Sequence, residues 1–303
     1  MLFGMIALIV TGASWSIVGI IMGSAPKHKV DTSFIQFFGS VFSILISIGL
    51  LLSIQTEWNN AMYFSMMCYF SGGLMNFLLL QLMSIAMQRG PNGTIWGIVQ
   101  SGVIFPFAMG ILFFAVPLPV TRICGMIILI AALFLFGKAK GNGGDKKEGN
   151  WLIPAFAAFI LCGIQQSVHN LPSYYPELTK LNPAYRTIFT ASGAILGAFC
   201  WNLYKILCRG FKPDCWSQLR NKYLWFYILA FKSYGFVTSY FLMYRGMDAL
   251  AKAGAGSIAY PLLVSSCIIG FFLYSVLILK EKNRPIQYTA FILCLAGIIL
   301  ISL

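Results

Sequence analysis

Long apolar stretches separated by short polar connections run along the whole chain. A helix that crosses the roughly 30 Å hydrocarbon core of a bilayer needs about 20 apolar residues. Ten stretches reach about that length, at 2–22, 32–54, 61–86, 93–115, 119–137, 151–171, 183–206, 222–244, 254–279 and 286–303. The pattern predicts an all-α integral membrane protein with ten transmembrane helices. No basic region precedes the first stretch, so we interpret it as a span and not as a cleaved signal peptide.

The two halves of this pattern resemble each other. The longest polar connection, 139–150, has the glycine and charge content of a flexible linker. On its two sides, Ala86–Ile95 and Ala249–Ile258 share three of ten positions, and Gly12–Val18 can be aligned with Gly163–His169. We therefore expect one five-helix repeat over 1–138 and a second over 151–303. An odd number of spans inverts the second repeat, as in transporters whose substrate site lies near the membrane midplane.

The composition agrees with this picture and excludes several functions. Of 303 residues, 59% are hydrophobic and 10% are charged, with a mean hydropathy of +0.80. Soluble domains carry about 25% charged residues, so a soluble enzyme, a nucleic-acid-binding protein and a disordered scaffold are excluded. The net charge of +13 reflects Lys and Arg at the ends of apolar stretches, where they anchor helices.

The basic residues are unevenly divided between alternate connections. Fifteen of the 21 Lys and Arg follow odd-numbered stretches, five follow even-numbered ones, and Lys232 lies inside a stretch. Cytosolic loops carry the excess of Lys and Arg. We therefore expect a multi-pass protein of the bacterial inner membrane with both termini outside the cytosol.

Lys232 is the strongest candidate for contact with a solute. It lies in the middle of the stretch 222–244, where a charge costs about 2.5–3.5 kcal/mol on insertion scales and should face a cavity or a partner. All eight acidic residues lie in connections or at the ends of stretches, so no buried counter-charge is evident. The alternative is that Lys232 bonds backbone carbonyls or extends to the membrane surface.

Amide and aromatic side chains on other stretches are further candidates. Gln165 and His169 are four residues apart and share a helix face, and Gln166 and Asn170 share the adjacent face. The other candidates for substrate binding are Asn76, Trp96, Gln100, Tyr234, Tyr260 and Trp15. Each could line a solute cavity, or could link or pack helices instead. For Trp96 with Gln100, the position in the repeat favours the cavity.

Glycines and prolines mark positions where helices begin or bend. Gly90 and Gly93 precede or open one stretch, as Gly254 and Gly256 do for another. A helix start there suits an anion, although close helix packing is the favoured explanation. Bends are expected at three prolines within stretches: Pro106, Pro154 and Pro261.

The sequence offers no sign of catalytic or cofactor chemistry. The eight cysteines show no CxxC spacing and do not cluster with His or carboxylate residues in a metal-binding pattern. We expect no metal site, no cofactor, no disulfide framework and no catalytic centre. An intramembrane enzyme is disfavoured because only two histidines are present, His28 in a connection and His169 without a nearby acid.

The C-terminal segment VLILKEKNRPIQYTAFILCLAGIILI (Val276–Ile301) ends one apolar stretch and places Glu281 at its foot before the final helix. It resembles the C-terminal signature of the drug/metabolite transporter superfamily, especially its EamA-like members, in which a helix ends in Leu-Gly-Glu-like residues. Lys280 departs from this signature, since it stands where the family often has Gly. The segment Leu78–Gln100 also has a weak resemblance to bacterial sugar-uptake branches, such as the rhamnose and glucose/ribose porters.

This resemblance implies a secondary transporter whose central cavity is lined by the first, third, fourth, sixth, eighth and ninth spans. We expect a small polar solute, favouring a sugar or polyol, to be moved by alternating access. Export or exchange of amino acids or related metabolites is the alternative. No carboxylate lies inside a stretch, so export of organic cations is disfavoured. Proton coupling would fall to His169, Lys232 or a group at the end of a span, and exchange against a counter-solute or uncoupled facilitation are the other modes.

Overall fold

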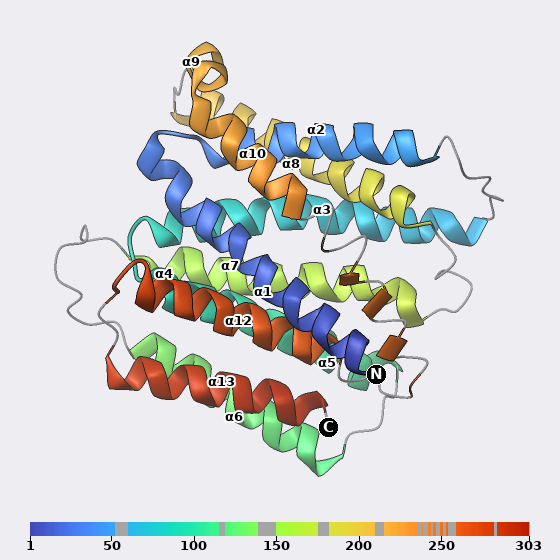
Figure 1. Cartoon of the computed structure of the whole chain (residues 1–303), viewed down its shortest axis with the longest axis vertical. Coiled ribbons are helices and arrows are strands. Elements are labelled where there is room, and N and C mark those ends of the chain that lie inside the picture. The colour runs from blue at the N-terminus through green and yellow to red at the C-terminus, as the bar shows by residue number, and fades with distance from the viewer. Residues whose placement is uncertain are drawn as a thin grey trace.

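A computed structural model of the protein shows helices stacked side by side in one bundle (Figure 1). Within the residues that it describes, every regular element is a helix and none is a strand. Those residues are 1–51, 60–114, 119–138, 150–174, 182–209, 215–234, 238, 242–243, 245–246, 249–250, 253, 259–281 and 284–302. Six helical segments among them are long and apolar enough to cross a membrane, and three shorter helices are also apolar, which fits a multi-pass membrane protein.

The helices follow the apolar stretches closely. In the first half they are α1 (Leu2–Ser24), 3-10 helix η1 (Ala25–His28), α2 (Thr32–Leu51), α3 (Asn60–Met87), α4 (Asn92–Gln100), 3-10 helix η2 (Ser101–Val103), α5 (Ile104–Phe114) and α6 (Val120–Lys138). In the second half they are α7 (Leu152–Asn170), 3-10 helix η3 (Leu171–Tyr174), α8 (Pro183–Arg209), α9 (Cys215–Arg220), α10 (Lys222–Tyr234), α12 (Ala259–Leu277) and α13 (Pro285–Ser302).

Proline explains one break in this pattern. The stretch expected at 93–115 is divided by η2, which separates α4 from α5. Pro106 has no N–H to donate to the Gly102 carbonyl and its ring crowds that carbonyl, so the regular helical bonding changes there. Pro154 lies in the first turn of α7, where N–H groups have no helical partner and a proline fits a straight helix. Pro261 lies in α12, and residues 254–258 before this helix lie outside the described residues, so the bend expected there stays a prediction.

Helices from the two halves pack directly against each other. The most extensive contacts join α6 to α13, α3 to both α7 and α8, α1 to α12, and α2 to α8. Figure 1 shows α2, α8 and α10 along one edge, with α9 projecting beyond them, α6 and α13 along the opposite edge, and α1, α3, α4, α5, α7 and α12 between the two edges. Small residues permit this approach: a Cβ on Gly73 would collide with the Thr190 carbonyl, and one on Gly193 with the Phe70 carbonyl.

The connections between helices gather at the two ends of the bundle. The N-terminal end holds Leu2, where α1 begins, and Ser302, where α13 ends (Figure 1). The opposite end, which we call the Glu281 end, holds the turn at Asp31 before α2 and the turn at Glu281 after α12. Each long helix therefore runs from one end of the bundle to the other.

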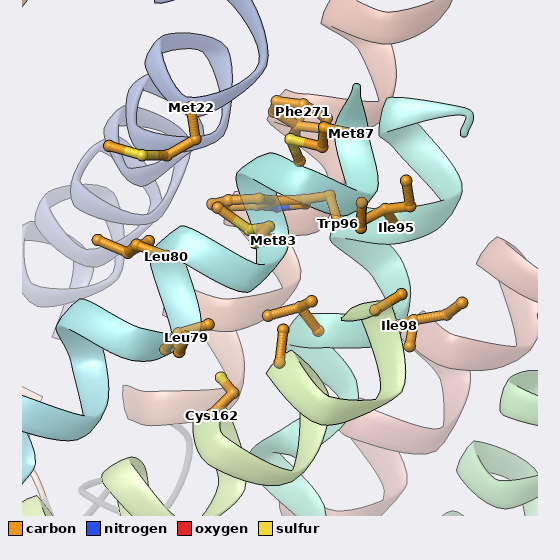
Figure 2. Packing of buried hydrophobic residues seen from close by; sticks show 14 of the residues in the cluster. Met22, Leu79, Leu80, Met83, Met87, Ile95, Trp96, Ile98, Cys162 and Phe271 are labelled. Carbon is orange, nitrogen blue, oxygen red and sulfur yellow. The ribbon is translucent and has the colours of Figure 1, made fainter. Parts of the chain in front are cut away.

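The apolar core lies where the central helices meet, and further apolar side chains cover the outside. Figure 2 shows the core around Trp96, where residues of α1, α3, α4, α7 and α12 meet. On the outer surface, Leu112, Phe113, Phe134 and Leu207 are each at least 69% exposed. An apolar exterior of this kind is stable against lipid rather than water.

Candidate functional site

Lys232 lies near the end of α10 and points toward α2. Its side chain crosses Gly39 so closely that a Cβ on Gly39 would lie 2.7 Å from Lys232 Cε and 3.6 Å from Nζ. The ammonium lies 4.7 Å from the centroid of the Phe231 ring. Among the described residues, none accepts a hydrogen bond from Lys232 or forms an ion pair with it. The N–H groups of the Lys232 ammonium can therefore donate hydrogen bonds to a ligand.

The face of α2 that meets Lys232 is polar and buried. Thr32, Gln36 and Gly39 follow one another at helical spacing along this face, and the two polar side chains are 6% and 3% exposed. The Thr32 hydroxyl donates to Gln81 Oε1 of α3 over 2.9 Å. The Nε2 groups of Gln36 and Gln81 are both buried without a hydrogen-bond partner. Hydrogen-bond donors are thus in excess around this face, which we call the α2 polar face.

Among the α7 candidates, His169 contacts another helix, whereas Gln165 and Gln166 bond to residues of α7 itself. His169 Nδ1 lies 2.8 Å from Gln165 Nε2, and its ring lies 5.4 Å from the Tyr69 ring of α3. A Cβ on Gly72 would overlap the His169 imidazole, so the α3–α7 contact is built around that ring. Gln166 donates to the Cys162 thiol over 3.2 Å, while its buried Oε1 has no partner.

Trp96 lies in the core at the meeting point of α1, α4 and α12. It is 2% exposed and stacks on Phe271, with ring centroids 4.8 Å apart (Figure 2). A Cβ on Gly19 would lie 2.5 Å from the Phe271 ring and 2.7 Å from the Trp96 ring. In this conformation Trp96 therefore packs helices together and does not face open space.

The remaining candidates are dispersed over four helices. Asn76, Gln100 and Trp15 are half-buried, on α3, at the end of α4 and on α1. Asn170, at the end of α7, is half-buried and interacts with another group of the protein. The side chains of Tyr234 and Tyr260 lie outside the described residues, as do the glycines at 254 and 256. Their roles as substrate contacts stay predictions.

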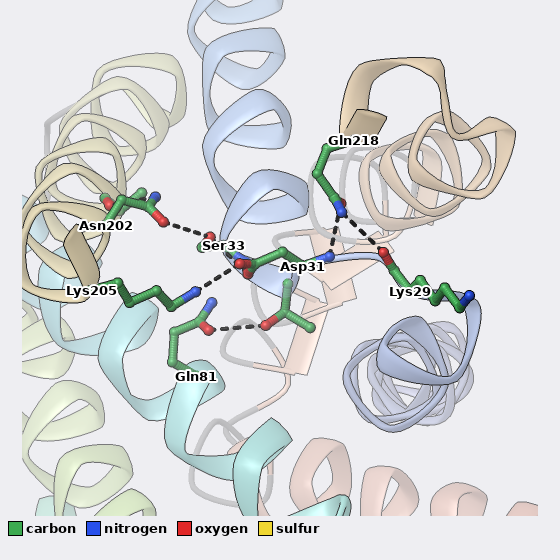
Figure 3. A network of polar contacts seen from close by, with 9 residues as sticks. Lys29, Asp31, Ser33, Gln81, Asn202, Lys205 and Gln218 are labelled. Carbon is green, nitrogen blue, oxygen red and sulfur yellow. Dashed lines mark hydrogen bonds and ion pairs between the residues drawn. The ribbon is translucent and has the colours of Figure 1, made fainter. Parts of the chain in front are cut away.

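A polar network at the Glu281 end was not foreseen from the sequence (Figure 3). Asp31 Oδ2 forms an ion pair with Lys205 Nζ at 2.7 Å, and both side chains are about one-fifth exposed. The other oxygen of Asp31 accepts bonds from the backbone and hydroxyl of Ser33, at 2.9 and 2.8 Å. Ser33 also reaches Asn202, and Gln218 accepts from the Asp31 backbone N–H. The network ties α2 to α8 and α9, and its partners are far apart in sequence.

The start of α4 carries an anion supplied by the protein itself. Glu281 Oε1 accepts a bond from the Asn92 N–H at 2.9 Å, and Oε2 accepts from the Gly93 N–H at 3.2 Å. The Ser275 hydroxyl donates to the same Oε2 at 2.8 Å. No side chain within α4 caps this end, so Glu281 satisfies the free N–H groups and the helix dipole. The anion site suggested by Gly93 is thus already filled.

The turn that positions Glu281 holds Lys280 in an unfavourable backbone conformation. Lys280 has a φ of 51°, in the left-handed region that glycine adopts without cost and other residues adopt with difficulty. A glycine, which the resembling family often has there, would relax this turn. The position of the carboxylate therefore depends on a backbone conformation that the local sequence alone would not favour.

Within the described part of the chain, no three His, Cys, Asp or Glu side chains converge where they could hold a metal ion. All eight cysteines are free, and four of them are buried: Cys68, Cys162, Cys267 and Cys294. They behave as small apolar groups in the helix contacts.

Comparison with known proteins gives the fold and no more. No protein-family model and no curated protein matches the chain. A solved structure described only as "Crystal structure of protein" matches 99% of this chain and 98% of its own, with a TM-score of 0.59 and 14% sequence identity. At this identity the likeness concerns the fold alone. The architecture of the whole chain, from α1 to α13, is therefore one that solved proteins share.

Proposed function

We propose that the protein is a secondary transporter, not an enzyme, and moves a small polar solute across the membrane by alternating access through a central cavity. The observation that carries this proposal is the ammonium of Lys232, held between α10 and α2 among apolar helices with no described acceptor. Charged groups inside membrane proteins are costly, and they mark solute and ion pathways.

The surroundings of Lys232 support a solute rich in oxygen acceptors. The unpaired Nε2 groups of Gln36 and Gln81 lie on or beside the α2 polar face, so donors outnumber acceptors there. A buried donor without a partner costs about 1–3 kcal/mol, and a bound oxygen would remove that cost. Sugar and polyol hydroxyls fit this requirement. The carboxylate of an amino acid or related metabolite fits it as well, and it is the alternative substrate class.

The helix contacts support two inverted five-helix repeats and ten spans. In this arrangement α1 corresponds to α7, α2 to α8, α3 to α10, α4–α5 to α12, and α6 to α13. If each helix is replaced by its counterpart in the other half, the α1–α12 contact becomes α7–α4 and the α3–α8 contact becomes α10–α2. The α3–α7 contact becomes α10–α1 in the same way. All three of these counterpart contacts occur. The contacts α2–α8, α4–α12 and α6–α13 map onto themselves.

The same contacts support the expected cavity helices. The six spans expected to line the pathway correspond to α1, α3, α4–α5, α7, α10 and α12. Five of them, α1, α3, α4–α5, α7 and α12, contact one another in the middle of the bundle, and α10 packs between α1 and α2 (Figure 1). The α2–α8 and α6–α13 pairs form the edges. These contacts, together with the resemblance of Val276–Ile301 to the C-terminal signature, support our proposal that the protein is an EamA-like member of the drug/metabolite transporter superfamily.

The distribution of basic residues supports an orientation in a bacterial inner membrane. Three described arginines lie toward the N-terminal end, Arg122, Arg186 and Arg245. The Glu281 end carries ten described basic residues: Lys27, Lys29, Arg89, Lys138, Lys205, Arg209, Arg220, Lys222, Lys280 and Arg284. By the positive-inside rule the Glu281 end faces the cytosol and both termini lie outside it.

Counterflow in proteoliposomes tests the proposal. Sugars, polyols, amino acids and carboxylates are offered to the wild type, to Lys232→Ala and to Lys222→Ala, which removes a lysine from the membrane surface of the same helix. We expect one of these classes to be exchanged by the wild type and by Lys222→Ala, and not by Lys232→Ala. Absence of flux with every class of solute refutes the transport function. Equal flux in all three proteins shows that Lys232 does not contact the solute.

A further inference from the structure

Two layers of contacts between α4 and α12 close the Glu281 end of the bundle. The outer layer is the carboxylate of Glu281 on the first two N–H groups of α4, joined by the Ser275 hydroxyl. The inner layer is the stacked pair of Trp96 on α4 and Phe271 on α12. Figure 2 shows Met22, Met83 and Met87 packed around this pair. In this conformation the two layers join α4 to α12 and to the turn that follows it.

A second bond reinforces the outer layer. Gln287, at the start of α13, donates to the Thr94 hydroxyl at 2.6 Å and accepts from the Arg284 N–H at 2.6 Å. The backbone or side chains of three successive α4 residues, Asn92, Gly93 and Thr94, are therefore held by the segment that follows α12. That segment lies almost 190 positions further along the chain.

We propose that Glu281 is the latch of the transport pathway, a carboxylate that holds the Glu281 end shut and must leave the start of α4 whenever that end opens. The inference rests on the proposed transport function. Since α4 and α12 both belong to the central helices and pack against each other, a path to this end has to part them. The Glu281 carboxylate bridges that boundary, and every opening breaks its bonds to Asn92 and Gly93.

The chemistry of the contact suits a reversible closure. Charged hydrogen bonds to a helix start are strong, yet they are lost without breaking a packed core. Glu281 is half-buried at the membrane surface, so water can solvate it when it leaves. Gly93 makes the approach possible, since a Cβ there would lie 2.6 Å from the Ser275 hydroxyl oxygen.

Labelling of Cys267 measures the latch independently of transport. Cys267 is fully buried and lies one helical turn before Phe271, beneath both layers. In the background variant the other seven cysteines are replaced by serine, so that Cys267 is the single cysteine left. This variant is placed in membrane vesicles of both orientations, and a membrane-impermeant thiol reagent is added. We expect Glu281→Ala to raise the labelling rate about tenfold, equivalent to about 1.4 kcal/mol, from one membrane side only. Glu281→Gln, which keeps an oxygen acceptor without the charge, should give an intermediate rate.

Asp31→Asn is the matched control. It removes a carboxylate from the same end of the bundle, but Asp31 ties α2 to α8 and not α4 to α12. We expect its labelling rate to equal that of the unmodified background. An unchanged rate in Glu281→Ala overturns the latch, and so does an equal rise in Asp31→Asn or a rise from both sides. Counterflow by the same vesicles is a separate readout. Faster labelling of Cys267 in Glu281→Ala, without flux of any solute, would refute the transport function alone.

Discussion

Replacing Gly39 by alanine tests whether the placement of Lys232 matters. The added Cβ would lie 2.7 Å from Lys232 Cε, whereas carbon atoms pack at about 3.5–4.0 Å. The lysine side chain therefore has to retreat by roughly 1 Å, which a flexible four-carbon chain can do without disturbing the backbone. Helix propensity favours the substitution by up to about 1 kcal/mol, so we expect the fold to be at least as stable as the wild type.

Solute binding should change in the opposite direction. The ammonium lies 3.6 Å from the new Cβ position and has to move with the rest of the side chain. Losing one charged hydrogen bond to the solute costs about 1.5–3 kcal/mol, or roughly 10- to 150-fold in half-saturation concentration. We expect Gly39→Ala to raise the half-saturation concentration in counterflow by a factor in that range, with an unchanged melting temperature.

Gly49→Ala on the same helix is the control, because no atom lies within 4 Å of its added Cβ. It gives the same gain in helix propensity without touching Lys232. If Gly39→Ala transports like Gly49→Ala and the wild type, Lys232 does not contact the solute and the reasoning from its position is refuted.

Three further predictions concern stability in detergent. Gly73→Ala should lower the melting temperature, at a cost of about 1–3 kcal/mol, because its Cβ meets the rigid Thr190 carbonyl; an unchanged value would mean that α3 and α8 can separate freely. Trp96→Ala should lower the free energy of unfolding in denaturant by about 3–5 kcal/mol, as expected for a core aromatic. A loss below about 1 kcal/mol would instead indicate that Trp96 lines a cavity. A double-mutant cycle of Asp31→Asn with Lys205→Met should give a coupling of about 1 kcal/mol that persists in high salt, since the pair is largely buried; zero coupling would show that the network does not stabilise the fold.

Helix positions were predictable from the sequence because span length and hydropathy are local properties. The expected stretches at 2–22 and 32–54 correspond to α1 at Leu2–Ser24 and α2 at Thr32–Leu51. The division of 93–115 by η2 was harder to foresee, since a proline inside a membrane helix permits several local arrangements.

The partners of the site residues could not be predicted in this way. Lys232 meets Gly39, and Glu281 meets Asn92, across more than 180 positions in each case. Such contacts depend on how the halves pack and leave no periodic signal in either segment. One signal was present for Glu281: α4 begins at Asn92 after Pro91 and has no capping side chain, so its free N–H groups required an acceptor from elsewhere.

The pairing of α6 with α13 has a consequence for biogenesis. Gly297 of α13 lies so close to α6 that a Cβ there would come within 2.9 Å of the Gly125 carbonyl oxygen, and Phe291 meets Phe136 edge-on at 4.9 Å. During synthesis α6 emerges 147 residues before α13 begins. The newly made first half must therefore wait in the membrane with the Gly125 face of α6 against lipid or an insertion chaperone. Ribosomes stalled before α13 should leave a product that quality-control proteases recognise by this uncovered face.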